Sequence, residues 1–383
     1  MKKICFVVSS EYVVKAYLLP QIAALSRVYE VSVAANTQDT GFLEGYGIDA
    51  RVFAAPVERR ILLLRDLRAL ASLTRLFQRE RFDAVHSVSP KAGLLTAIGA
   101  VFARVPVRIH TFTGQVWATR RGASRFLLKN LDRLLSALTT HILVDSRSQR
   151  EFLLAERVIP RGKSAVLANG SICGVDTARF RPDPEARTAI RRESNIAETD
   201  TLFIFLGRMN KDKGVLDLAD AFSRVRGGRP NVHLLFVGPD EGNMLPRIRE
   251  ICSGCAKAVH HVDYTDVPER YMASADVLCL PSYREGFGNV VIEAGAAGLP
   301  VIATSIYGVT DAVEEGVTGV LYEPGNTDAL AEWMERFAEN REMRRRMGEN
   351  GRVRAQRDFA MDSVTAALID YYRTLWADAR RSR

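Results

Sequence analysis

The stretch LPSYREGFGNVVIEAGAAGLPVIAT, residues 280–304, predicts the end of a strand, a tight glycine loop, a helix that opens at Asn289 and a second strand. A strand–helix–strand unit joins parallel strands, whereas an antiparallel pair needs only a short turn. The same alternation continues outward from this stretch toward both ends of the chain. It therefore predicts an α/β protein built on parallel sheets.

Two series of apolar, strand-length runs alternate with helix-length segments. The first series is KICFVV, VSVAAN, DAVHSV, VRIHTF, HILVDS and SAVLANG, and the second is TLFIFLG, NVHLLFVG, AVHHVDY, DVLCLPS, LPVIATS and GVLYEPG. Each series predicts a Rossmann-like, doubly wound sheet covered by helices on both faces. We expect two such domains, residues 1–178 and 200–358, that face each other across a cleft. The polar segment 179–199 is expected to link them, and residues 359–383 to form a helix that packs back on the first domain.

Positive charge is concentrated in the first half of the chain. Residues 1–178 carry 25 Lys and Arg against 14 Asp and Glu, whereas the remainder carries 28 against 31. The segment from Arg59 to Arg81 is the most basic, and its leucines recur at helical spacing. This pattern fits a helix with a solvated basic side, and equally a helix that touches anionic lipid headgroups. The sequence lacks the pattern of aromatic residues among basic ones that is typical of nucleic-acid-binding grooves, so we expect no nucleic-acid partner.

Cysteine usage and hydropathy indicate the compartment. The five cysteines are scattered, which favours a reducing environment over a disulfide framework. Cys252 and Cys255, followed by His260 and His261, leave a zinc or redox site open, although the same run fits a helix end that leads into a strand. No segment is long and apolar enough to span a bilayer. We expect a cytoplasmic protein that associates peripherally with the inner face of the plasma membrane.

The loop and helix of residues 280–304 form the strongest candidate site. Backbone can approach a ligand closely at glycine, and the N–H groups at a helix start suit a pyrophosphate. Glu293 lies about one turn into the helix, where its carboxylate could accept hydrogen bonds from a ribose diol. Glu285 precedes the loop and could bind sugar hydroxyls. The expected ligand-binding loop consists of Gly286, Phe287, Gly288, Asn289 and Val290.

A second motif, FLGRMNKDKGVLDLADAF, spans residues 205–222. A predicted strand ends at Gly207, and Arg208 and Lys213 follow it. Two cations at a strand end can neutralise a diphosphate. Since the sequence contains no convincing DxD motif, these cations and helix N–H groups would take the place of a divalent metal, and we expect metal-independent chemistry with no cofactor.

Together, EGFGNVVIEA, GRMNKDKG, FVVSSEYVVKAYLLPQIAALS and SICGVDTARF resemble glycosyltransferase family 4, whose fold is termed GT-B. The resemblance covers essentially the whole chain, and the spacing between Glu285 and Glu293 is its most specific part. It implies a retaining enzyme that takes a hexosyl or N-acetylhexosaminyl group from a nucleotide sugar, with UDP favoured, to a saccharide acceptor bound by the first domain. RIHTFTGQVW, residues 108–117, is similar to bacterial enzymes that build surface polysaccharides on a polyprenyl-diphosphate carrier.

The same resemblance implies roles for individual residues. Arg208 and Lys213 would bind the donor diphosphate, Glu285 the donor sugar and Glu293 the ribose. Two departures from the family pattern stand in the first domain. Ser9, Ser10, Glu11 and Tyr12 replace a common glycine pair, and Thr113 stands where many members have a histidine. His110 is therefore a catalytic candidate that could take the place of the family's histidine. The alternative is that it packs within a strand.

Two other functions remain open from the sequence. One is a nucleotide-sugar epimerase with the same fold, which would release an epimerised sugar nucleotide without an acceptor. The other is a non-catalytic subunit that binds a nucleotide sugar and positions a partner enzyme. The sequence leaves the donor sugar, the acceptor, the linkage and the oligomeric state undetermined.

Overall fold

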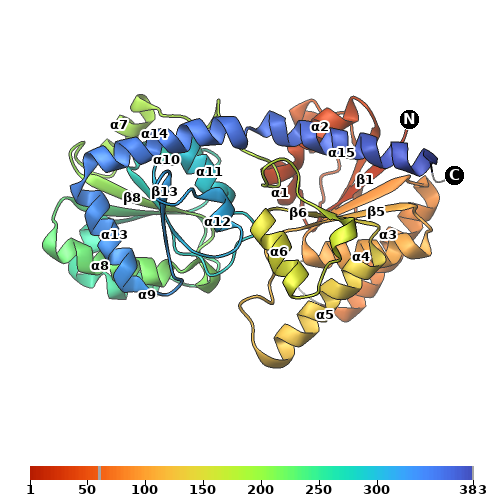
Figure 1. Ribbon diagram of the computed structural model, residues 1–383, viewed down its shortest axis with the longest axis horizontal. Coiled ribbons are helices and arrows are strands. Elements are labelled where there is room, and N and C mark those ends of the chain that lie inside the picture. Colours follow the sequence, from red (N-terminus) through yellow and green to blue (C-terminus); the bar gives the residue numbers. More distant parts are fainter. Residues whose placement is uncertain (59–61, 382–383) are drawn as a thin grey trace. The chain divides into compact units, whose positions relative to one another are not determined.

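Two compact units make up the computed structural model, which describes residues 1–58 and 62–381 (Figure 1). The first unit contains Met1–Cys173 and Met361–Arg383, and the second contains Gly174–Ala360. The chain passes between the units at residues 173–174, a few residues before the expected linker, and again at residues 360–361.

The first unit is built on a parallel sheet of seven strands in the order β3-β2-β1-β4-β5-β6-β7. Strand β1 is buried on both faces, because Ile4 and Phe6 enter one apolar core while Cys5 and Val7 enter the other. A run that is apolar at every position is typical of such a central parallel strand. The strands are β1 (Lys3–Val7), β2 (Glu30–Ala35), β3 (Arg51–Ala54), β4 (Ala84–Val88), β5 (Val107–Phe112), β6 (His141–Val144) and β7 (Ser164–Ala165).

Helices cover both faces of this sheet. Helices α3 and α4 pack on one face, whereas α2 and α15 pack on the other. A short α1 (Glu11–Val13) and a π-helical turn at Val14–Leu18 lead into α2. The longer helices are α2 (Leu19–Ser26), α3 (Leu63–Glu80), α4 (Pro90–Phe102), α5 (Gly122–Leu138), α6 (Arg147–Ala155) and α15 (Met361–Arg381).

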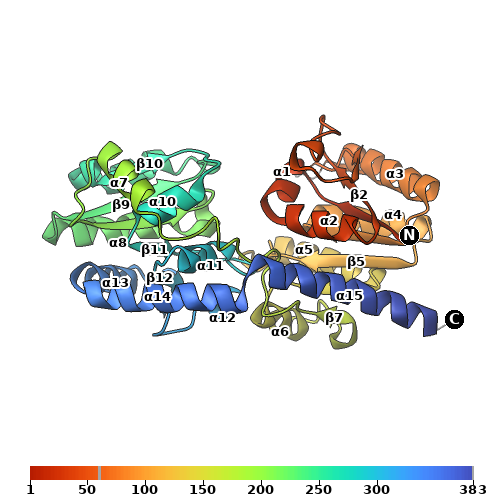
Figure 2. The same ribbon diagram turned by 90° about the horizontal axis from the view of Figure 1, so that it is seen from above.

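Helix α15 belongs to the first unit although it follows the second unit in sequence. It lies along the first unit in both views (Figures 1 and 2), and Leu368, Tyr372 and Leu375 enter the same core as α2. The Tyr372 hydroxyl is 2.9 Å from Nδ1 of the buried His86 on β4. The C-terminal helix expected from the sequence thus completes a core of the first unit.

The second unit holds a parallel sheet of six strands in the order β10-β9-β8-β11-β12-β13. Along β8, Phe203 and Phe205 face one core, while Leu202 and Ile204 face the other. The strands are β8 (Thr201–Leu206), β9 (Val232–Val237), β10 (Val259–Val262), β11 (Val277–Leu280), β12 (Val301–Thr304) and β13 (Gly319–Tyr322). The helices are α7 (Pro184–Glu193), α8 (Val215–Gly228), α9 (Leu245–Ile251), α10 (Pro268–Ser274), α11 (Asn289–Ala296), α12 (Val309–Ala312), α13 (Thr327–Glu339) and α14 (Arg341–Asp358).

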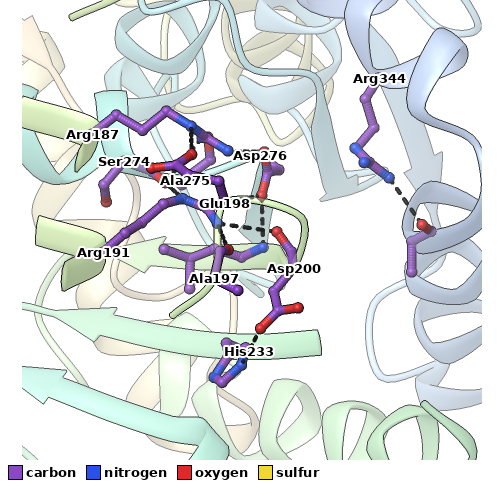
Figure 3. A network of polar contacts seen from close by, with 12 residues as sticks. Arg187, Arg191, Ala197, Glu198, Asp200, His233, Ser274, Ala275, Asp276 and Arg344 are labelled. Carbon is purple, nitrogen blue, oxygen red and sulfur yellow. Dashed lines mark hydrogen bonds and ion pairs between the residues drawn. The ribbon is translucent and has the colours of Figure 1, made fainter. Parts of the chain in front are cut away.

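Residues 179–199, expected as a linker, form part of the second unit. Phe180 and Ile196 enter its core on either side of α7. Arg191 of α7 is 1% exposed and donates hydrogen bonds to the carbonyl oxygens of Ala197, Asp200 and Ser274. Its Nη2 also lies 2.5 Å from Oδ2 of Asp276 (Figure 3). The segment is polar in sequence because its arginine guanidinium groups donate hydrogen bonds to buried carbonyl oxygens. These contacts hold the segment in place within the second unit.

Candidate active site

The candidate residues of the second unit follow the carboxyl ends of neighbouring strands. Strand β8 pairs directly with β11, so the loops 207–214 and 281–288 leave the same edge of the sheet next to each other. Gly214 has a φ of 64°, and a Cβ atom there would lie 2.0 Å from the carbonyl oxygen of Pro281. Since only glycine permits this approach, Gly214 holds the two loops in contact.

Lys213 and Glu285 form the centre of the candidate site. The Lys213 Nζ atom is 2.5 Å from Glu285 Oε1, and the side chains are 21% and 13% exposed. The Ser282 hydroxyl donates a hydrogen bond to the same Oε1 atom at 2.8 Å, and Ser282 itself is buried. The Glu285 carboxylate is thereby held from two sides, while both charged groups keep surface through which a ligand could contact them.

Arg208 follows Gly207 at the end of β8 and is paired differently. Its Nη1 atom is 2.9 Å from Oε2 of Glu241, in a pair whose side chains are 42% and 37% exposed. Asp240, beside Glu241, accepts hydrogen bonds from the backbone N–H groups of Met244 and Leu245 and so fixes this loop. In the described part of the chain, no hydrogen bond or ion pair joins Arg208 to Lys213. The two cations therefore lie at the same edge of the sheet, each paired with a different carboxylate.

Glu293 lies one turn into α11, the helix that follows the loop after β11. Burial raises the pKa of the Glu293 carboxyl group to about 7, and the charge of Glu269 adds to this rise while Arg179 opposes it. Arg179 is itself bound to Glu269 at 2.9 Å. A carboxyl group with this pKa changes charge near neutral pH, and hydrogen-bond donors from a ligand would favour its ionised form.

The loop before α11 offers backbone rather than side chains to a ligand. The Phe287 ring is 2% exposed and packs 5.3 Å from the ring of Phe359, so this side chain belongs to the core. Val290 is half-buried against the same core. A Cβ atom on Gly308 would lie 2.3 Å from the Gly286 carbonyl oxygen, which shows how closely the next loop packs here. The Phe287 side chain anchors the loop in the core, and its backbone is the part that could contact a ligand.

His110 does not extend the candidate site. It lies on β5 in the first unit, is fully buried, and its Nδ1 atom is 2.9 Å from the Ser87 hydroxyl. Its ring packs against Phe112 and also fills the space beside Gly93 of α4. Burial lowers the pKa of His110 to about 3, so the imidazole is neutral. This burial favours the alternative in which His110 packs within a strand.

The cysteine pair offers no metal centre. The Cys252 thiol is buried and donates to the carbonyl oxygen of Ala219, and His260 Nε2 is 3.2 Å from His233 Nδ1 on the neighbouring strand. Within residues 1–58 and 62–381, no three or more His, Cys, Asp or Glu side chains are grouped so as to hold a metal ion. The open alternative of a zinc site at Cys252 and Cys255 is therefore not supported by the geometry.

Asp212 and Arg284 were missed in the sequence. The Arg284 Nη2 atom is 2.9 Å from Oδ2 of Asp212, and the Tyr283 N–H donates to the Asp212 carbonyl oxygen at 2.8 Å. Both residues stand immediately before a predicted site residue, Lys213 or Glu285. Their position next to Lys213 and Glu285 was the only sequence feature that pointed to them. The pairing itself depends on the contact between two loops about 70 residues apart in sequence.

Solved structures and protein families agree with this architecture. The Anabaena protein HepE, solved in complex with UDP and glucose, matches with a TM-score of 0.80 at 20% identity, over 98% of this chain and 100% of that one. A sucrose-phosphate synthase from Thermosynechococcus elongatus also matches with a TM-score of 0.80, at 21% identity over 99% and 100% of the two chains. Two parallel-sheet units of this kind define the GT-B fold, the fold of one large class of glycosyltransferases.

Sequence comparison identifies the family. The model for a glycosyl transferase 4-like domain matches residues 14–170, and the model for glycosyl transferases group 1 matches residues 186–354. The Staphylococcus aureus capsular polysaccharide biosynthesis glycosyltransferase CapM is 30% identical over 83% of this chain and 84% of its own. An Escherichia coli UDP-Gal:alpha-D-GlcNAc-diphosphoundecaprenol alpha-1,3-galactosyltransferase is 26% identical over 85% and 87%. The chain belongs to glycosyltransferase family 4 and is a glycosyltransferase of the GT-B type.

Among the described residues, none of the helices combines the length and the apolar character that a bilayer crossing requires.

Proposed function

We propose that this glycosyltransferase transfers a hexosyl or N-acetylhexosaminyl group from a UDP-sugar to a saccharide acceptor, with retention at the anomeric carbon. The observation that carries the proposal is the Lys213–Glu285 pair, held at 2.5 Å where β8 and β11 end. A cation and a carboxylate side by side suit a donor that presents a diphosphate next to a sugar. Arg208 would share the diphosphate charge, and Glu293 would bind the ribose hydroxyls.

The chemistry that we propose uses no protein nucleophile. The bond from the sugar C1 atom to the diphosphate breaks while the acceptor oxygen bonds to C1 on the same face. The proton of the acceptor hydroxyl passes to the departing diphosphate oxygen. Arg208 and Lys213 would stabilise the charge that develops on that oxygen, and the loop backbone would orient the donor. We propose that these cations serve in place of a divalent metal, so that turnover persists in excess EDTA.

Nucleotide binding offers the most direct test. Ligands that bind the native state raise the apparent melting temperature, in proportion to the logarithm of their concentration above Kd. We expect UDP and UDP-sugars to stabilise the purified protein more than GDP or GDP-mannose do. The UDP bound by HepE and the UDP-galactose in the E. coli relative's name support this choice, whereas another relative is named for GDP-mannose. Stabilisation by guanine nucleotides alone would overturn the assignment.

We further propose that the acceptor saccharide is carried on a polyprenyl diphosphate in bacterial surface-polysaccharide synthesis. Supporting this proposal are the names of the S. aureus and E. coli relatives. Incubating the protein with UDP-sugars and a short polyprenyl-diphosphate-linked saccharide should give an extended lipid product by mass spectrometry. Release of an epimerised sugar nucleotide without acceptor would instead indicate an epimerase, and UDP-sugar binding with no product would indicate a non-catalytic subunit.

An anionic membrane surface is the partner that we propose for the first unit, bound from the cytoplasmic side. Leu63, Leu64 and Leu67, in the first turns of α3, are 78%, 75% and 62% exposed, and Phe126 near the start of α5 is 72% exposed. Within the described residues, Arg68, Arg75, Arg120 and Arg121 on or beside these helices have no carboxylate partner. Arg59 and Arg60 of the basic segment lie outside the described residues. Exposed apolar groups among cations are typical of helices that bind anionic lipid.

Vesicle binding tests this partner. Wild-type protein should bind vesicles with 30% anionic lipid at low salt and dissociate as salt rises, because screening weakens the attraction. Replacing Phe126 and Leu127 by serine should reduce binding. Phe102, which is 68% exposed at the end of α4, provides a matched control. If Phe102→Ser weakens binding as much as the paired substitution, the proposed surface is wrong.

A further inference from the structure

Two adjacent ion pairs join the loops after β8 and β11, and the cation comes from the first loop in one pair and from the second loop in the other. Asp212 and Lys213 are consecutive on the first loop, and Arg284 and Glu285 are consecutive on the second. Lys213 binds Glu285 at 2.5 Å, while Arg284 approaches Oδ2 of Asp212 through Nη2 at 2.9 Å and through Nε at 3.3 Å. Each loop thus supplies one residue of either sign, so that each pair spans the gap between the loops.

Backbone contacts fix where these pairs form. The main-chain oxygen of Asp212 accepts a hydrogen bond from the Tyr283 N–H, and its carboxylate binds the next residue, Arg284. The Tyr283 hydroxyl donates to Oδ2 of Asp217 at 2.6 Å, which ties the second loop to the first turn of α8. Gly214 packs directly against Pro281. The Asp212–Arg284 pair is therefore one part of a larger seam between the loops.

We call Lys213–Glu285 the inner pair and Asp212–Arg284 the outer pair. A bound donor would affect the two pairs differently. Under the proposed function, a diphosphate competes with Glu285 for the Lys213 ammonium, so the inner pair must rearrange when the donor binds. The outer pair has no assigned contact with the donor. A planar guanidinium that meets one carboxylate through two of its N–H groups also has less freedom than a lysine ammonium.

We propose that the Asp212–Arg284 ion pair is a positioning clamp, which keeps Lys213 and Glu285 in register while the donor displaces their direct contact. This inference rests on the proposed function. Reacting groups must be held within about 0.5 Å of their productive geometry, and misplacement by about 1 Å can cost up to about a hundredfold in rate. Asp212 and Arg284 are thus positioning residues that act through their neighbours.

Kinetics of three variants test the clamp. Asp212→Asn and Arg284→Gln should each lower kcat about tenfold, with a much smaller change in KM for the donor and native melting temperatures. The exchanged variant, Asp212→Arg with Arg284→Asp, should recover part of the lost kcat, since it restores a pair of opposite charges. Arg224→Gln is the matched control, because it breaks the exposed Arg224–Asp328 pair of the same unit and should leave kcat unchanged. Wild-type kcat in both single variants, or an exchange that recovers nothing, would overturn the proposal.

Chemical labelling of Lys213 gives a second measurement that needs no donor. An amine-reactive ester, quantified at each lysine by mass spectrometry, should modify Lys213 severalfold faster in Asp212→Asn and Arg284→Gln than in the wild type. Lysines outside the loops should react at equal rates in all variants. Equal Lys213 labelling would overturn the clamp. Faster labelling in a protein that binds no nucleotide would retain the clamp and overturn the proposed function instead.

Discussion

The two ends of the second unit's sheet carry similar charged residues and use them differently. At the amino ends of the strands, Arg191 is 1% exposed and is surrounded by protein acceptors, with Asp276 as its ion-pair partner (Figure 3). At the carboxyl ends, Arg208 is 42% exposed and Lys213 is 21% exposed, and each has one carboxylate partner.

This difference separates charges that hold the fold from charges that are available for binding. A buried guanidinium whose hydrogen bonds are all satisfied within the protein has none to offer a ligand, and its removal exposes unpaired acceptors. A partly exposed cation in a single pair contributes little to stability and can exchange its carboxylate for a phosphate. The comparison therefore predicts which substitutions change the free energy of unfolding and which change activity.

The largest expected effect is on stability. Arg191→Ala removes one of the two arginine partners of Asp276, together with a buried cation's hydrogen bonds to the carbonyl oxygens of Ala197, Asp200 and Ser274. The free energy of unfolding should therefore fall by about 3–5 kcal/mol. Urea denaturation followed by circular dichroism measures this loss. Arg224→Ala, which breaks an exposed pair, should cost less than about 1 kcal/mol. Similar losses in the two variants would remove the distinction between the two ends of the sheet.

Next in size is the effect of Lys213→Ala on turnover. Losing the cation nearest to the proposed leaving diphosphate should lower kcat/KM about 10²–10³-fold, while the free energy of unfolding changes by less than about 1 kcal/mol. Lys211, exposed in the same short 3-10 turn, is the matched control. If Lys211→Ala and Lys213→Ala retain equal activity, Lys213 does not bind the diphosphate.

Glu293 should make nucleoside binding depend on pH. Its pKa of about 7 in the free protein must fall when ribose hydroxyls donate to the carboxylate. Binding then requires loss of a proton below pH 7, so affinity for uridine should weaken by up to about tenfold for each pH unit below that value. Uridine is used because it has no titrating phosphate. Calorimetry between pH 5.5 and 8 should show this dependence in the wild type, and a flat profile in Glu293→Gln.

The smallest expected effect concerns Glu241. This carboxylate holds Arg208 in an exposed pair worth about 0.2–1 kcal/mol, and a diphosphate must replace it. Glu241→Gln should therefore bind UDP up to about fivefold more tightly, as measured by calorimetry at low salt. Asp328→Asn, at a remote exposed pair, should leave affinity unchanged. Weaker UDP binding in Glu241→Gln would mean that Glu241 orients Arg208 for the ligand.

Periodicity identified most of the fold, and its failures have physical reasons. The apolar runs marked the central strands of both sheets because such strands are buried on both faces. Strand β3 was missed since it lies at an edge, where Arg51 and Ala54 are exposed. Helix α7 was assigned to a linker because the segment is polar and contains Pro182 and Pro184, whereas Arg187 and Arg191 both donate hydrogen bonds to the carbonyl oxygen of the buried Ser274.

The candidate site was predicted in composition but not in geometry. The motifs brought Arg208, Lys213 and Glu285 to one edge of the sheet, since parallel strands end together. Which cation meets which carboxylate depends on the contact between two loops, and no local pattern encodes it. His110 shows the opposite limit, because a polar residue in a strand has the same sequence signal whether it faces a ligand or, as here, a buried serine.

Helix α15 sets the order in which the chain can complete its fold during synthesis. Residues 1–173 leave the ribosome before the second unit, but their core lacks Tyr372, whose ring is fully buried beside His86, until α15 has been translated after that unit. The whole second unit emerges in the meantime and can fold as a continuous segment. The first unit, although it precedes the second in sequence, therefore completes its core later. A version of it expressed alone would need residues 361–381 joined to residue 173.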